Sequence, residues 1–241
     1  MTNTLPPVVS REDWLTARKT LLAKEKAATK VRDALNAERR RLPMVKVDKE
    51  YLFTGPDGKR TLAEIFEGRS QLYVHHFMWL DDQDRGCPSC TAAADQHFTP
   101  QILAELHKRD VTFVAIARAP YAKIEAYSEG RGWQFPFYSS DGTDFNYDFH
   151  ATLDESKAPV EFNYKSKDEL LAQGFKETDL RGDWPVNSVF LRDGDSVFHT
   201  YSAFARGLDH NVTIYNFLDL TPYGRQEGWE DSPEGWPKLF R

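Results

Sequence analysis

The chain has 241 residues, of which 40% are hydrophobic and 28% are charged, so it can form one large globular domain with extensions. The formal net charge of -6 argues against general nucleic-acid binding, because neutralising phosphates needs a basic surface. No apolar run approaches the roughly 20 residues of a membrane-spanning helix, and residues 1–14 lack the basic and apolar regions of a secretory signal. We therefore expect a cytoplasmic protein without nucleic-acid or membrane partners.

Residues 1–43 are predicted to form a helical extension. Ser10 can cap a helix that begins near Arg11 and ends before Pro43. Apolar side chains recur every seven positions along this helix, which predicts a stripe that must be buried. They are Trp14, Leu21, Ala28 and Leu35. The stripe can pack on the chain's own domain or join two copies of the chain, so a homo-oligomer through this helix stays open.

Residues 44–220 alternate between strand and helix patterns, which predicts an α/β domain. The strand patterns lie at 44–53, 71–80, 111–119 and 133–140, and the helix patterns lie at 61–68, 91–110 and 121–130. The segment 71–80, QLYVHHFMWL, is apolar almost throughout, as expected of a strand buried on both faces of a sheet. Pro100 should kink or divide the helix at 91–110.

Residues 141–241 show a polar insertion, a hairpin, a helix and a tail. Residues 187–202 favour two strands joined by an Asp-Gly turn, which is typical of a hairpin. A polar segment at 141–183 precedes this hairpin and is predicted to be an insertion with a helical piece at 167–173. A final helix is expected near 209–218, and residues 221–241 form a tail rich in glycine, proline and tryptophan.

The two cysteines, Cys87 and Cys90, lie three positions apart between a predicted strand and a predicted helix. An extracellular disulfide framework would need more cysteines at wider spacings, and a zinc site of four thiolates is impossible with two. At the start of a helix, residues i and i+3 are close enough to form a disulfide with little backbone movement. The first thiol also lies near the positive end of the helix, which lowers its pKa. We therefore expect Cys87 to be the attacking thiolate and Cys90 the resolving thiol.

This arrangement resembles the thioredoxin superfamily, and the chain from about residue 10 to its end resembles a bacterial family of thioredoxin-like proteins of unknown function. Members of that family are described as predicted dithiol-disulfide oxidoreductases. The resemblance is carried by His76–Met78, Gly86–Cys90, Val197–Ser202, Ala205–Gly207 and Leu218–Pro222. It implies a thioredoxin-like mixed central sheet flanked by helices, with the long N-terminal helix and the insertion as additions. It also implies thiol-disulfide oxidoreductase activity, with a thiol or disulfide substrate and a reducing partner.

The chain departs from ordinary thioredoxins at two functional positions. Their substrate-docking cis-proline should fall near Val186 or Asn187, and this sequence has Pro185 instead. They also use a buried acid near the second cysteine, and we see none at the matching strand position, so His76 is our candidate for carrying that proton. The peroxiredoxin pattern Pro-x-x-x-Thr-x-x-Cys fits neither cysteine, so peroxidase chemistry of that type is not expected.

Two alternative functions are compatible with the sequence. Cys87, Cys90 and His199 could bind copper or zinc, because two sulfurs and an imidazole suit either metal. The fold could also serve as a redox-inert binding module. The dithiol chemistry itself needs no organic cofactor, and the absence of a glycine-rich phosphate loop indicates that electrons come from another thiol or a reductase.

Overall fold

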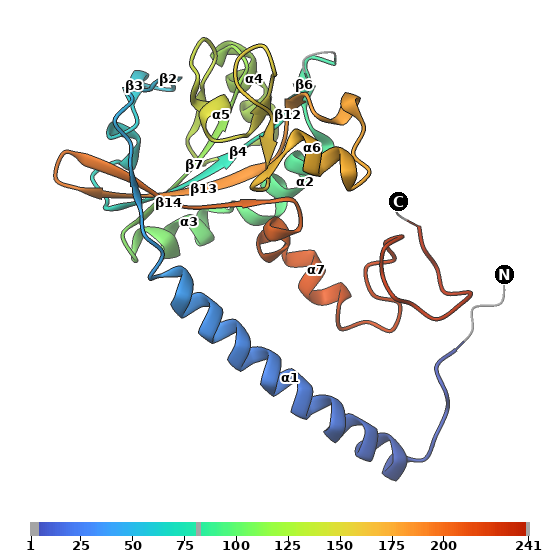
Figure 1. Cartoon of the computed structure of the whole chain (residues 1–241). Helices are drawn as coiled ribbons and strands as arrows, with labels where there is room; N and C mark the ends of the chain where they lie inside the picture. Colours follow the sequence, from blue (N-terminus) through green and yellow to red (C-terminus); the bar gives the residue numbers. More distant parts are fainter. Residues whose placement is uncertain (1–4, 81–82, 240–241) are drawn as a thin grey trace. The chain divides into compact units, whose positions relative to one another are not determined.

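The computed structural model describes residues 5–80 and 83–239 (Figure 1). The chain divides into two compact units. Residues 43–212 form one unit, and residues 1–42 together with 213–241 form the other. The last predicted helix, near residues 209–218, is assigned by its sequence to the 44–220 domain. In this division most of it belongs to the same unit as the tail.

A mixed sheet of eight strands forms the centre of the 43–212 unit. In spatial order its strands are β1 (Val45–Lys46), β14 (Ser196–Phe204), β13 (Val186–Asp193), β4 (Gln71–His76), β7 (Val111–Ala117), β8 (Phe137–Ser139), β2 (Leu52–Gly55) and β3 (Gly58–Thr61). β4 and β7 are parallel, whereas β13 is antiparallel to β4 and forms a hairpin with β14. A parallel strand-helix-strand unit joined to an antiparallel hairpin is the thioredoxin-like mixed sheet that the sequence predicts.

Three helices connect the parallel strands β4, β7 and β8. α2 (Pro88–His97) and α3 (Pro100–His107) connect β4 to β7, and α4 (Tyr121–Arg131) connects β7 to β8. The helix predicted at 91–110 is divided as expected at Pro100, which cannot continue the hydrogen-bond ladder of α2. The Thr99 hydroxyl caps α3 by accepting a hydrogen bond from the Ile102 amide.

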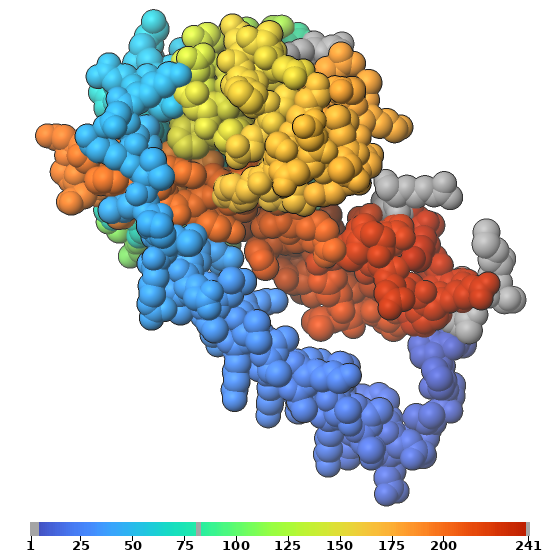
Figure 2. Space-filling view, viewed as in Figure 1, coloured from blue at the N-terminus to red at the C-terminus, as the bar shows by residue number. Residues whose placement is uncertain are grey.

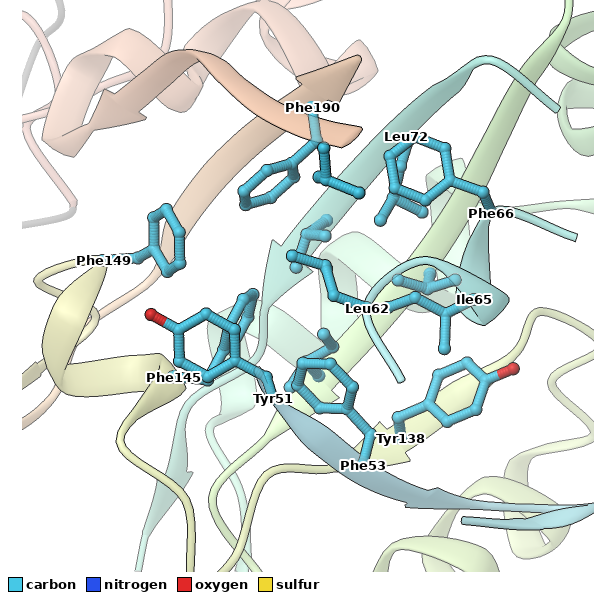
Figure 3. Packing of buried hydrophobic residues seen from close by; sticks show 14 residues of the cluster. Tyr51, Phe53, Leu62, Ile65, Phe66, Leu72, Tyr138, Phe145, Phe149 and Phe190 are labelled. Carbon is cyan, nitrogen blue, oxygen red and sulfur yellow. The ribbon is translucent and has the colours of Figure 1, made fainter. Parts of the chain in front are cut away.

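The two faces of the sheet carry separate hydrophobic cores, because successive side chains of a strand point to opposite sides. On β7, Phe113, Ala115 and Ala117 pack with side chains of α2, α3 and α4. Val114 and Ile116 belong to the core on the other face. Figure 3 shows this second core, in which the short helix η1 (Glu64–Phe66) and α5 (Phe145–Asp148) meet the sheet. The dithiol helix therefore belongs to the first face.

Figure 2 shows the segment 141–183 at the surface in yellow to light orange. The segment has a small core of its own, which its polar composition did not suggest. Its elements are α5, β9 (Thr152–Leu153), β10 (Glu161–Phe162), β11 (Lys165–Ser166), α6 (Lys167–Ala172), the short helix η2 (Glu177–Asp179) and β12 (Gly182–Asp183). The predicted helical piece is confirmed as α6. This helix begins with a capping box between Ser166 and Glu169. Phe162 and Leu170 are almost fully buried and pack near the base of the β13–β14 hairpin through Val186 and Phe204.

The predicted N-terminal helix is α1 (Arg11–Arg39), and Ser10 caps it by accepting a hydrogen bond from the Asp13 amide. No residue of α1 is buried, and Leu21 of the apolar stripe is 51% exposed. A contact between two copies through this stripe stays a prediction. α1 is too polar to cross a membrane, and the other helices within residues 5–80 and 83–239 are too short or too polar for it.

The C-terminal residues of the sheet unit form the short helix η3 (Ala205–Asn211), and α7 (Thr213–Leu218) follows in the other unit. In the tail, the Arg225 guanidinium pairs with the Asp219 carboxylate at 2.7 Å and lies over the Tyr215 ring. A local ion pair and ring contact thus order a segment that is rich in glycine and proline.

The backbone directly before the dithiol leaves no room for a side chain at Gly86. A β-carbon there would lie 2.7 Å from Phe77 Cε1 and 2.9 Å from Tyr127 Cε1, and both are packed aromatic rings. We expect Gly86→Ala to lower the free energy of unfolding by about 1–3 kcal/mol, as overpacking does, in a urea titration followed by circular dichroism. The matched control is Gly130→Ala in α4, where nothing lies within 4 Å of the new β-carbon, and it should raise stability by about 0.4–1 kcal/mol. Equal stability of Gly86→Ala and the wild type would contradict this packing.

Candidate active site

A short hairpin positions the dithiol at the first turn of α2. It consists of β5 (Trp79–Leu80) and β6 (Arg85–Gly86), in which Trp79 pairs with Gly86. The Cys87 amide donates to the Met78 carbonyl at 3.0 Å, and Cys87 is the N-cap of α2. Pro88 occupies the first turn, where its missing N–H costs no helical hydrogen bond. The sequence therefore folds locally as predicted, with Cys87 outside the helix and Cys90 one turn inside it.

The two thiols are free and have opposite environments. Cys87 is half-buried, whereas Cys90 is buried with 4% exposure. A hydrogen bond from the Cys90 thiol, joined by the backbone amides of Cys90 and Ser89, lowers the pKa of Cys87 to about 5 even though partial burial opposes this. The same hydrogen bond and nearly complete burial raise the pKa of Cys90. One accessible thiolate and one protected thiol are the pair that thiol–disulfide exchange requires.

Aromatic side chains pack in the core that contains Cys90. Trp79 and Tyr127 meet edge to face with their ring centroids 5.5 Å apart, and both contact the core that contains Cys90. The Tyr127 hydroxyl shares a hydrogen bond of 2.9 Å with Thr91, the residue after Cys90. The hydrogen bond ties the first turn of α2 to α4, in the core where Cys90 is buried.

Asp183 is a functional candidate that the sequence interpretation missed. Its side chain is only 3% exposed, and its charge is one of the causes that raise the pKa of Cys90. Asp183 accepts hydrogen bonds from the Thr152 hydroxyl at 2.6 Å, Arg118 Nε at 3.3 Å and the Trp79 amide at 3.4 Å. Burial raises the pKa of Asp183, although these donors oppose the shift. A buried acid is therefore present near Cys90, but the insertion supplies it through β12, where no local sequence signal marks it.

His76 lies away from the dithiol. It alternates with His75 on β4, and it stacks on Phe145 in the core opposite α2 with a centroid distance of 5.3 Å. His76 Nε2 shares a hydrogen bond of 3.0 Å with the Ser188 hydroxyl, and burial lowers the pKa of His76 to about 3. A neutral imidazole on the other face of the sheet gives no support to the predicted proton-carrying role of His76.

His199 is also separate from the two sulfurs. It lies on β14 opposite Val45 and Phe190, packs against Phe149, and shares a hydrogen bond of 2.8 Å with Ser202. Among residues 5–80 and 83–239, no three histidine, cysteine or acidic side chains are grouped so that they could hold a metal ion. The alternative metal site of Cys87, Cys90 and His199 is therefore not supported, because the imidazole lies against the core on the face opposite α2.

Pro185 directly precedes β13, whose first residue Val186 pairs with His76. No peptide bond in the described ranges is cis, so Pro185 follows a trans bond. Pro185 thus directly precedes the hairpin strand, and the peptide bond before it is trans, whereas that of the thioredoxin proline is cis.

A family profile described as "Bacterial protein of unknown function (DUF899)" matches residues 3–239. The chain belongs to this family. The profile covers both compact units, so the N-terminal helix and the tail are part of the family's chain and not additions of this one.

No curated protein matches this DUF899 member. Among solved structures it is similar to a mutant of peroxiredoxin Q from Xanthomonas campestris, at 14% identity and a TM-score of 0.45, with 70% of this chain and 89% of that chain covered. It is similar to the peroxidoxin BcpB from Mycobacterium tuberculosis at 14% identity and a TM-score of 0.43, with coverages of 71% and 94%. At such identities and scores, the activities in those names are not transferred to this chain.

The electrostatic environment of Cys87 can be measured by its rate of alkylation. In the reduced protein, the rate of reaction with iodoacetamide should rise with pH around a midpoint near 5, because the Cys90 thiol stabilises the thiolate. Cys90→Ala removes the hydrogen-bond donor, so its midpoint should move up towards the ~8.5 of a free cysteine, whereas Cys90→Ser retains a donor and should stay lower. A wild-type midpoint near that of a free thiol would contradict the assigned environment.

Proposed function

We propose that this protein is a thiol–disulfide oxidoreductase in which Cys87 is the nucleophile and Cys90 the resolving thiol. The observation that carries the proposal is the position of the two sulfurs: half-buried Cys87 is the N-cap of α2, and Cys90 is almost fully buried one turn inside the helix. A hydrogen bond from the Cys90 thiol lowers the pKa of Cys87 to about 5. At neutral pH the outer sulfur is then a thiolate, and the inner sulfur stays protonated until it is needed.

The exchange proceeds in two balanced steps. The Cys87 thiolate attacks one sulfur of a substrate disulfide, a mixed disulfide forms, and the second substrate sulfur leaves as a thiolate. Cys90 then loses its proton and attacks the Cys87 sulfur, which releases the remaining half of the substrate and leaves a Cys87–Cys90 disulfide. Two electrons pass from the dithiol to the substrate, so a reducing thiol partner is needed to restore the protein.

Asp183 is the group best placed to accept the proton of Cys90. It is the buried carboxylate whose charge is felt at Cys90, and it contacts the same Met78–Trp79 segment that holds the dithiol. Burial raises the pKa of Asp183, which brings it closer to that of a thiol than an ordinary carboxylate and so favours proton transfer.

The first test is trapping of the mixed disulfide. Cys90→Ser should react with one equivalent of 5,5'-dithiobis(2-nitrobenzoic acid) and retain one thionitrobenzoate on Cys87, because no resolving thiol remains. The measurement is intact-protein mass spectrometry together with the absorbance of the released thiolate. Cys87→Ser is the matched control, and its buried Cys90 should react at least about tenfold more slowly, since burial suppresses thiolate formation. Equal labelling of both variants would argue against the proposal.

The second test addresses Asp183. Asp183→Asn should slow the resolution step by about 100-fold or more, the lower part of the range for a general base, while the mixed disulfide still forms. In the wild type, resolution should slow as pH falls through the pKa of Asp183, which lies above that of an ordinary carboxyl group. Stopped-flow release of the second thionitrobenzoate measures the step, and Asp168→Asn on the exposed first turn of α6 is the control. Resolution in Asp183→Asn at the wild-type rate and with the same pH profile would exclude the role.

A further inference from the structure

A cavity of about 440 Å³ lies beside the core on the face of the sheet opposite α2. Its volume is within the range of about 300–1,000 Å³ that is usual for small-molecule sites. β1, the segment before β2, β14 and the insertion form its walls. The described lining residues lie between positions 45 and 204 and outside the dithiol segment, so a ligand bound there is separate from thiol exchange.

Aromatic rings form much of the cavity wall. Tyr51, Phe149 and Phe204 line it, and all three are buried. Tyr51 and Phe149 lie side by side with their ring centroids 6.1 Å apart (Figure 3). Tyr164 also lines the cavity, and its ring meets Phe204 edge to face at 5.4 Å. Because aromatic rings attract one another in stacked and edge-to-face arrangements, these walls favour a ligand with an aromatic ring.

Tyr164 has a left-handed backbone conformation, with a φ of 61°, in the turn between β10 and β11. This region suits glycine and asparagine and is strained for a bulky side chain. Asn163, its neighbour in the turn, is of the preferred type, so the turn itself does not call for a tyrosine. The Tyr164 hydroxyl donates to the Ser202 carbonyl at 2.9 Å, which holds the ring beside β14. Backbone strain of this kind gathers at ligand sites.

The charged side chains around the cavity are already engaged. Asp148 accepts hydrogen bonds from Lys49 Nζ and the Tyr51 hydroxyl, both at 2.7 Å, and Lys46 Nζ lies 2.8 Å from Asp48. The third lining acid, a glutamate on β10, lies 3.7 Å from the Nε2 atom of a histidine. A charged ligand of either sign would therefore have to break existing contacts, so the cavity suits an uncharged molecule.

A chain of hydrogen bonds leads from the cavity into the core. His199 and Ser202 line the cavity and share a hydrogen bond of 2.8 Å. The chain continues from Ser202 to Ser188 at 2.9 Å and from Ser188 to His76 at 3.0 Å. A serine hydroxyl can take part in three hydrogen bonds, once as donor and twice as acceptor. The two side-chain partners leave Ser202 Oγ able to accept one more bond, from a hydroxyl of a ligand.

We propose that this cavity binds an uncharged aromatic alcohol of the phenol class. The ring of the ligand packs among Tyr51, Phe149 and Phe204, and Tyr164 lies beside it. The hydroxyl of the ligand donates to Ser202 Oγ at the start of the hydrogen-bond chain. This site is a second function of the protein, because it lies on the other face of the sheet from Cys90.

The test measures binding of four small probes to the wild-type protein at pH 7 by fluorine NMR relaxation. The first is 4-fluorophenol, which is uncharged because a phenol has a pKa near ~10. Fluorobenzene lacks the hydroxyl and should bind about fivefold more weakly, as for the loss of one hydrogen bond. Anionic 4-fluorobenzoate and cationic 4-fluorobenzylamine should both bind more weakly than 4-fluorophenol. The net charge of -6 would by itself favour the cation, so the expected order opposes the overall field.

Two variants localise the bound probe. Tyr164→Gly relieves the left-handed conformation but removes one wall, so it should weaken binding of 4-fluorophenol by about fivefold. Asn163→Gly is the matched control, because it lies in the same turn with a φ of 52° and is not among the lining residues. It should keep the wild-type affinity. Ser202→Ala should make 4-fluorophenol and fluorobenzene bind equally well, since the acceptor is lost.

Three results would each overturn the proposal: no binding of 4-fluorophenol to the wild type, tighter binding of a charged probe, or undiminished binding of 4-fluorophenol to Tyr164→Gly. Tyr164 is 66% exposed, so its replacement by glycine leaves the core intact and the test decisive even if Ser202→Ala does not fold. None of these results involves Cys87, so the proposed thiol–disulfide exchange stands or fails separately.

Discussion

The Met78–Trp79 peptide unit is the element on which the geometry of the site depends. Its carbonyl accepts the Cys87 amide, and its N–H donates to the buried Asp183 carboxylate. A planar peptide fixes the relative direction of these two groups, so one backbone unit aligns the start of α2 with the acid from β12. The arrangement of the thiolate, the protected thiol and the buried acid follows from this connection.

The sheet separates Cys90 from His76 and His199, because the dithiol and the two histidines lie on opposite faces of it. Cys90 belongs to the core under α2, α3 and α4, whereas His76 and His199 contact the core of Phe145, Phe149 and Phe190. Burial lowers the pKa of both histidines, so each stays neutral and hydrogen bonded inside the sheet. Neutral histidines with serine partners act as structural polar groups there, because a buried charge without a counter-ion would be far more costly.

The insertion changes how the thioredoxin-like sheet can be used. It has its own small core of residues such as Phe162 and Leu170, and this core anchors it to the base of the hairpin. The insertion contributes Asp183 and Thr152 to the neighbourhood of the dithiol and lines a cavity beside them. The thioredoxin-like sheet thereby obtains a buried acid and an adjoining cavity from a segment outside its strands.

The sequence by itself determined the alternation of strands and helices, the hairpin near the end of the domain, the division of the helix at Pro100, and the position of Cys87 and Cys90 at the start of α2. These features depend on local chemistry, namely apolar strand patterns, proline geometry and the i, i+3 spacing at a helix start. Only the tertiary structure decided which other groups meet the dithiol. Asp183 lies 93 positions beyond Cys90 in a polar segment, and its partners come from β9 and from the residue after β7. The packing of the insertion decides that Asp183 lies near the dithiol, and a local sequence pattern cannot predict such a distant contact. The face of β4 on which a side chain lies decides that His76 does not, although its position in the sequence suggested it.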